Sequence, residues 1–142
     1  MKKILPILFL VFFAVSPAAY AEDMTEKPGM SNATTYAVAY HADWCGSCKV
    51  LAPKMDEVKA ALPKEVAEKI EFVKFDFTDD ATKETSKTMA EGKGLLDLYL
   101  NDAKTGQVKL VDIESGNVLG TIKKDLSVEE INGAMTAIST RS

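Results

Sequence analysis

The only two cysteines of this 142-residue chain, Cys45 and Cys48, lie in the segment WCGSCK, residues 44–49. Residues 36–40, just before them, form an apolar run with the length of one buried strand. After them, apolar residues recur at i, i+3 and i+4 spacing from 48 to 62, which predicts the buried face of a helix. The pair is therefore expected where a strand gives way to a helix, with Cys45 at or just before the first helical turn.

This position favours a thiolate at Cys45. The first backbone N–H groups of a helix lack intrahelical partners, and the helix dipole adds partial positive charge there. In such a place the pKa of a thiol, ordinarily about 8.5, can fall by one to several units. A second cysteine in the same helical turn can close a disulfide with the first. We predict a redox dithiol in which Cys45 is the exposed, low-pKa nucleophile and Cys48 is the buried, resolving partner.

The composition of the sequence divides the chain into three parts. Residues 1–21 combine two lysines, an apolar core of about a dozen residues and an A-x-A site, which is typical of a secretory signal peptide. Residues 22–35 contain proline, glycine and asparagine without periodicity and are interpreted as a flexible leader. One domain is expected over 36–142. Export would place the dithiol in an oxidising compartment, in our interpretation a bacterial periplasm.

Charge narrows the range of partners. The full chain carries a formal net charge of −4. Cleavage after Ala21 would remove Lys2 and Lys3 and leave −6. An acidic protein is not expected to bind nucleic acid or an anionic membrane surface. We expect a monomer without a bound cofactor.

The other predicted elements give a mixed α/β order. The helix that follows Cys48 should stop before Pro63, and a central strand, covered on both faces, should follow it. The segment 95–100 fits a strand or a short helix, and we favour the helix. Ser127 and Glu130 form a capping box that opens the last helix. The expected ranges are strands at 36–40, 70–77, 108–113 and 118–122, and helices at 48–62, 81–91, 95–100 and from 127 onwards.

Three features together resemble the thioredoxin family: the WCGSCK segment, Pro53 five residues after the second cysteine, and the strand at 70–76. The resemblance extends, more weakly, from about Tyr36 to Ile138. It implies an α/β chain with the minimal thioredoxin-like fold, βαβαββα, in which helices cover both faces of a mixed sheet. It also implies that residues beside the dithiol support its chemistry or meet the substrate: Trp44, Gly46, Ser47 and Lys49.

The first departure from the family concerns a buried charge. Thioredoxins usually carry an aspartate six residues before the first cysteine, opposite a lysine of the next strand, and here that position is Ala39. Lys74 matches the lysine. Asp76, two residues further along the same strand face, is a candidate replacement partner. The alternative is that Lys74 and Asp76 are ordinary solvated strand-end charges.

The second departure is a missing proline. Thioredoxin-like proteins nearly always place a cis-proline against the dithiol before the third strand, but no proline follows Pro63. We expect the facing loop at 105–108, with Val108 as the substrate-groove residue; the alternative is 94–96. In this family, loss of that proline can expose the pair to metal ions.

Three functions remain open. The first is an exported thiol–disulfide oxidoreductase that acts on protein disulfides and exchanges electrons with a membrane or periplasmic donor or acceptor. The second is a periplasmic metal-binding protein or metallochaperone, for copper(I) or zinc, with Cys45, Cys48 and His41 as soft ligands. The third is a binding module with a vestigial dithiol. A four-ligand structural zinc site is disfavoured, because the chain has two cysteines and one histidine.

Overall fold

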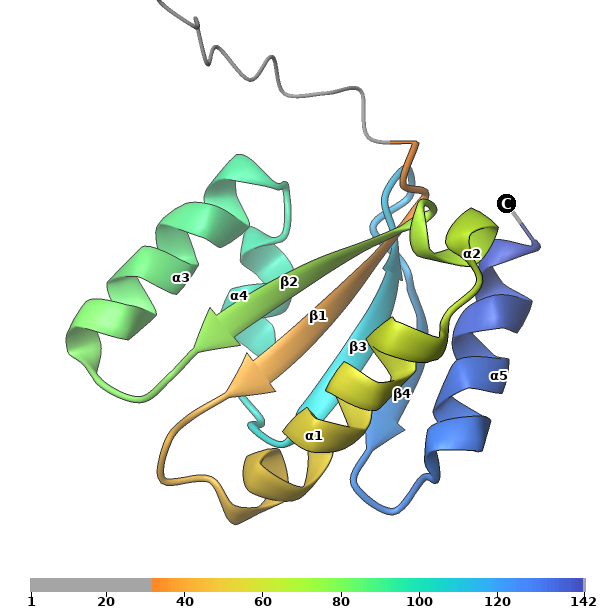
Figure 1. The fold of residues 1–142 in the computed structure, drawn as a ribbon. Helices are drawn as coiled ribbons and strands as arrows, with labels where there is room; N and C mark the ends of the chain where they lie inside the picture. Colours follow the sequence, from red (N-terminus) through yellow and green to blue (C-terminus); the bar gives the residue numbers. More distant parts are fainter. Residues whose placement is uncertain (1–31, 142) are drawn as a thin grey trace, which may run out of the picture.

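A computed structural model describes residues 32–141, so the predicted signal peptide and most of the predicted leader lie outside the described residues. Figure 1 shows the order of the elements. They are β1 (Thr35–His41), α1 (Gly46–Ala61), α2 (Lys64–Ala67), β2 (Ile70–Asp76), α3 (Asp80–Gly92), α4 (Leu96–Asn101), β3 (Gln107–Asp112), β4 (Val118–Lys123) and α5 (Val128–Ser139). No helix within 32–141 has both the length and the apolar character needed to cross a membrane.

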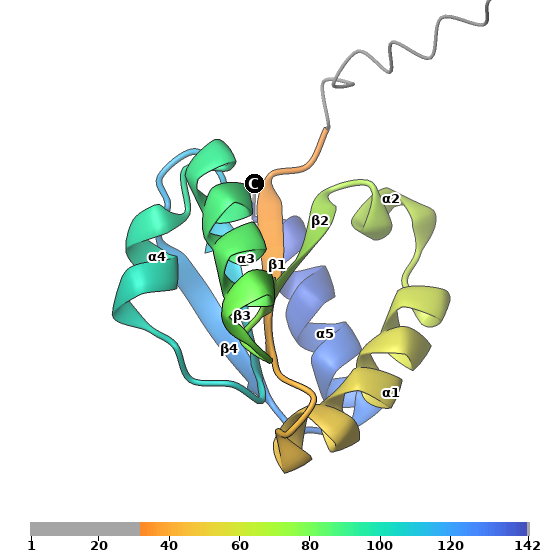
Figure 2. The ribbon, with the colours of Figure 1, turned by 90° about the vertical axis from the view of Figure 1, so that its left-hand side faces the viewer.

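The four strands form one mixed sheet in the order β2-β1-β3-β4. β1 runs parallel to β2 and antiparallel to β3, and β3 pairs antiparallel with β4. Figure 2 shows α3 and α4 on one side of this sheet and α1 and α5 on the other. This is the mixed sheet, covered by helices on both faces, that the sequence predicted.

Each face of the sheet has its own hydrophobic core, because side chains alternate along a strand. On β1, Ala37 belongs to the core under α1 and α5, whereas Val38 and Tyr40 belong to the core under α3 and α4. The second core also contains both cysteines. It holds four stacked or edge-to-face aromatic rings, those of Tyr40, Phe75, Phe77 and Tyr99.

Several sequence predictions are confirmed with shifts of a residue or two. The segment 95–100 is helical, as favoured, and forms α4. The Ser127 side chain accepts a hydrogen bond from the Glu130 N–H, and the Glu130 carboxylate accepts one from the Ser127 N–H, so the capping box forms. The prediction missed α2, a single turn after Pro63, because four residues show no periodicity.

A carboxylate holds the loop that connects α4 to β3. Asp102 forms an ion pair with Lys109 of β3, and the exposed fractions of their side chains are 23% and 14%. Asp102 also accepts hydrogen bonds from the Lys104 N–H and the Gln107 side chain. Burial alone would raise the pKa of Asp102, but the hydrogen bonds from Lys109, Lys104 and Gln107 lower it below its ordinary value. The loop is thus tied to the start of β3.

We predict that Asp102→Asn lowers the free energy of unfolding by about 1–2 kcal/mol at pH 7, since it leaves a partly buried ammonium without its counter-charge. The folded-state pKa of Asp102 is depressed, so the stabilisation is complete above the ordinary value of 3.8 and is lost as the pH falls through the folded-state value. Urea unfolding should show a smaller deficit at pH 3 than at pH 7.

The matched control is Asp80→Asn, which removes a fully exposed partner of Lys83. We expect a change close to zero at both pH values. A deficit for Asp102→Asn that is as large at pH 3 as at pH 7 would contradict the role of the charge.

Candidate active site

Cys45 is the N-cap residue of α1, with an extended backbone at φ −84° and ψ 109°. Its sulfur accepts a hydrogen bond from the Cys48 backbone N–H at 3.2 Å. The two cysteines are joined by a disulfide, with their Cα atoms 5.3 Å apart. A sulfur at this place faces the unpaired N–H groups of the first turn, which stabilise a thiolate after reduction.

Both cysteines are buried, with exposed fractions of 7% for Cys45 and 4% for Cys48. The prediction that Cys45 is exposed is therefore wrong for the disulfide form. The reason is the loop before β3, which packs against the pair. Sequence periodicity gives no sign of this contact, because it joins segments about sixty residues apart in the chain.

Gly106 is the residue that lies against the sulfurs. A Cβ added to it would lie 2.6 Å from Ser47 Cβ and 3.4 Å from Cys45 Sγ, and its φ of +83° is one that favours glycine. The expected facing loop was therefore right, and within it the residue against the dithiol is Gly106 and not Val108. Val108 is 1% exposed and pairs with Ala39 and Ile122 in the interior of the sheet.

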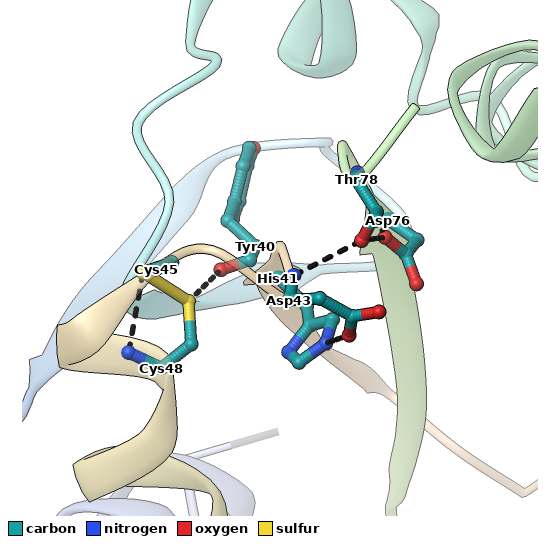
Figure 3. Close-up of a disulfide and its surroundings, with 7 residues drawn as sticks. All are labelled: Tyr40, His41, Asp43, Cys45, Cys48, Asp76 and Thr78. Carbon is teal, nitrogen blue, oxygen red and sulfur yellow. Dashed lines mark hydrogen bonds and ion pairs between the residues drawn. A yellow bond between two sulfur atoms is a disulfide. The ribbon is translucent and has the colours of Figure 1, made fainter. Parts of the chain in front are cut away.

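The Tyr40 carbonyl oxygen joins this loop to the dithiol. It accepts a hydrogen bond from the Gly106 N–H at 2.8 Å. Cys48 Sγ lies 3.5 Å from the same oxygen, so a Cys48 thiol can donate to it after reduction (Figure 3). Burial, together with the nearby charge of Asp102, raises the pKa of the Tyr40 phenol, which stays protonated beneath the site.

A chain of hydrogen bonds runs from Asp76 to the loop before Cys45. The Asp76 carboxylate accepts from the Thr78 N–H at 3.0 Å and from its hydroxyl at 2.5 Å. The Thr78 hydroxyl accepts from the Asp43 N–H (Figure 3). The Thr78 carbonyl accepts from the Trp44 indole at 3.3 Å. Asp76 thereby positions the tryptophan that precedes the nucleophile. No sequence motif marks Thr78, so it was not among the predicted site residues.

Lys74 and Asp76 are paired, with Nζ and Oδ2 3.3 Å apart. Lys74 lies opposite Ala39 in the β1–β2 register, as its match to the family lysine implies. Burial alone would raise the pKa of Asp76, but hydrogen bonds from Thr78 and the Lys74 ammonium lower it. The carboxylate points at Thr78, and it does not line the pocket beside Cys48.

His41 points away from the dithiol. Its Nε2 lies 3.1 Å from an Asp43 carboxylate oxygen (Figure 3). Within residues 32–141, no group of three or more histidine, cysteine, aspartate or glutamate side chains is arranged to hold a metal ion. The three-ligand set of Cys45, Cys48 and His41 is therefore not assembled in this disulfide form.

The remaining predicted residues form the surface around the pair. Trp44 is 66% exposed, and Val50, one residue beyond the motif, is 47% exposed. Gly46 and Lys49 are exposed and Ser47 is partly buried, because the loop with Gly106 covers it. The exposed Trp44 and Val50 side chains and the Lys49 ammonium thus border the buried sulfurs.

We predict that Gly106→Ala destabilises the disulfide form for two reasons: backbone strain at a positive φ, and steric overlap of the new Cβ with Ser47. A positive φ costs an alanine about 1–2 kcal/mol, and the crowding against Ser47 adds about 1–3 kcal/mol. Gly116→Ala is the matched control, because Gly116 has φ +71° but nothing within 4 Å of an added Cβ. Urea unfolding should give the larger loss for Gly106→Ala. Equal losses would show that Gly106 does not pack against the dithiol.

Known proteins resemble this chain across most of its length. The thioredoxin family model matches residues 12–125. Thioredoxin-T of Drosophila melanogaster is 26% identical over 110 residues, which cover 72% of this chain and 68% of that protein. Two solved structures are similar at lower identity. Trxlp from Edwardsiella tarda has a TM-score of 0.48 at 15% identity, with 74% of this chain and 84% of that chain covered. MTB dsbF has a TM-score of 0.49 at 19% identity, with 74% and 81% covered.

The match spans well over half of the chain, and the dithiol sits at the start of α1, directly after β1 of a mixed sheet. The substrates of such a site are proteins that contain disulfides. The chain belongs to the thioredoxin family, and its Cys45–Cys48 pair makes it a thiol–disulfide oxidoreductase.

Proposed function

We propose that this protein is exported to a bacterial periplasm and there reduces or exchanges disulfides of other proteins. It acts as a monomer, and a membrane or periplasmic partner returns its Cys45–Cys48 pair to the starting redox state. The observation that carries the proposal is the hydrogen bond from the Cys48 N–H to the Cys45 sulfur, 3.2 Å long, at the first turn of α1. It marks Cys45 as the sulfur that is stabilised as a thiolate. Export is supported by the signal-like residues 1–21, and persistence of disulfides is a property of such compartments.

The reaction takes two exchange steps. The Cys45 thiolate attacks one sulfur of a substrate disulfide, forms a mixed disulfide with it and releases the other substrate sulfur as a thiolate. Cys48, after losing its proton, attacks Cys45 Sγ, re-forms the Cys45–Cys48 disulfide and releases the second substrate thiolate. The substrate gains two electrons and the protein loses two.

The surroundings of the pair fit these roles. The exposed Trp44 ring and Val50 offer an apolar surface to a partner chain. Thr78 holds the indole through its carbonyl group, so this surface keeps its place beside Cys45. Both sulfurs are covered in the disulfide form, so attack on a substrate needs the reduced pair to present Cys45 at this surface.

Kinetic trapping in cells tests the order of attack and the compartment together. Cys48→Ser removes the resolving thiol, so mixed disulfides should accumulate and appear as reducible high-mass bands on non-reducing gels. The bands should be found in the periplasmic fraction released by osmotic shock from a Gram-negative host.

Cys45→Ser is the matched control and should trap almost nothing, since the remaining thiol is not stabilised by the helix start. Stronger trapping by Cys45→Ser would reverse the roles of the two cysteines. Bands confined to the cytoplasmic fraction would contradict the proposed compartment and leave the chemistry intact.

A further inference from the structure

A pocket of about 310 Å³ opens between α1 and the sheet, on the face that α1 and α5 cover. Its lining includes Cys48, Tyr40 and Gly106, so the pocket extends to the dithiol. It lies over Ala39, the position at which thioredoxins usually carry an aspartate. Three alanines line the pocket, namely Ala37, Ala39 and Ala52, and their small side chains leave the space empty.

The body of the pocket is apolar. Leu51 and Met55 line it from α1, and Phe72 lines it from β2. Leu51 and Met55 are buried, at 3% and 6% exposed. Concave sites of about 300–1,000 Å³ with mainly apolar walls are typical of small-molecule binding. The volume lies at the lower end of that range and fits a small ligand.

Charged side chains complete the lining. Lys59 extends over the Phe72 ring, with its ammonium 4.9 Å from the ring centroid, and Lys74 lines the pocket from β2. Asp56 is the one carboxylate in the lining. The lining therefore carries two cations and one anion, next to apolar walls.

The two lysines already have ion-pair partners. Lys59 Nζ lies 3.7 Å from an Asp56 carboxylate oxygen, and the side chains are 45% and 77% exposed. An exposed pair of this kind is worth about 0–1 kcal/mol, so an anion can share or replace the partner of Lys59 at low cost. Lys74, 57% exposed, pairs with Asp76, which is only 24% exposed, so an anion at this ammonium shares it with the Asp76 carboxylate.

We propose that this pocket binds a small amphipathic carboxylate, such as a medium-chain fatty acid, with its chain against Leu51, Met55 and Phe72. The carboxylate lies between Lys59 and Lys74. The apolar end lies toward Cys48. Binding depends on the pocket and its lysines and does not require disulfide exchange.

Displacement of a fluorescent probe tests the proposal on the oxidised protein. The probe is 1-anilinonaphthalene-8-sulfonate, an amphipathic anion that fluoresces in apolar surroundings. Decanoate, kept below its micellar concentration, should displace it. Decyltrimethylammonium, which has the same chain and the opposite charge, should not. Equal displacement by both would show an apolar patch without charge selection and would overturn the proposal.

Variants of the lining locate the site. Lys59→Met and Lys74→Met should each weaken decanoate binding about threefold to fivefold, since each removes one nearby charge at the solvent edge. Asp56→Asn should strengthen it about twofold. Lys64→Met is the matched control: Lys64 is an exposed lysine that pairs with Glu68 outside the pocket, and its loss should change nothing.

Filling the space gives the complementary test. Ala52→Leu adds bulk from an exposed helix position, and Ala39→Leu adds it from the floor. Either variant that keeps the wild-type circular dichroism spectrum and unfolding midpoint should bind decanoate at least tenfold more weakly. Undiminished binding to both folded variants, or no binding to the wild-type protein, would overturn the proposal.

Discussion

The chemistry of this protein depends on a single contact, the hydrogen bond from the Cys48 N–H to Cys45 Sγ at the start of α1. The contact exists because Cys45 keeps an extended backbone as N-cap while Gly46 begins the helix. A thiolate there meets N–H groups that have no other partner, which lowers the free energy of the reduced, charged form. The sheet and both cores serve to bring β1 to this point and to pack α1 against it.

The loop before β3 packs against the dithiol and shapes the site. Gly106 lets the backbone approach the sulfurs, and its N–H shares the Tyr40 carbonyl with Cys48. Asp102 fixes the same loop to β3 through Lys109 and Gln107. The wall over the dithiol is thus formed by Gly106, in a loop that Asp102 anchors to β3, and both cysteines are buried. On the other side of the pair, Ala39 leaves a pocket in place of a buried charge.

Local signals predicted most of the fold and the centre of the site. The helix periodicity after Cys48, the capping box at Ser127 and the strand-to-helix position of the cysteines each depend on neighbours in sequence, and each is confirmed. Contacts between distant segments could not be predicted. Gly106 against Ser47 and Thr78 against Trp44 arise only when the sheet brings their loops together, so the groove was assigned to Val108 and the exposure of Cys45 was overestimated.

The most direct test of the central claim is the thiolate absorbance of the reduced protein at 240 nm, followed from pH 4 to 11. We predict one thiol with a pKa at least about one unit below the ordinary 8.5. That titration should persist in Cys48→Ser and disappear in Cys45→Ser. A lowest midpoint at or above 8.5, or a low midpoint that survives in Cys45→Ser, would contradict the claim that the start of α1 activates Cys45.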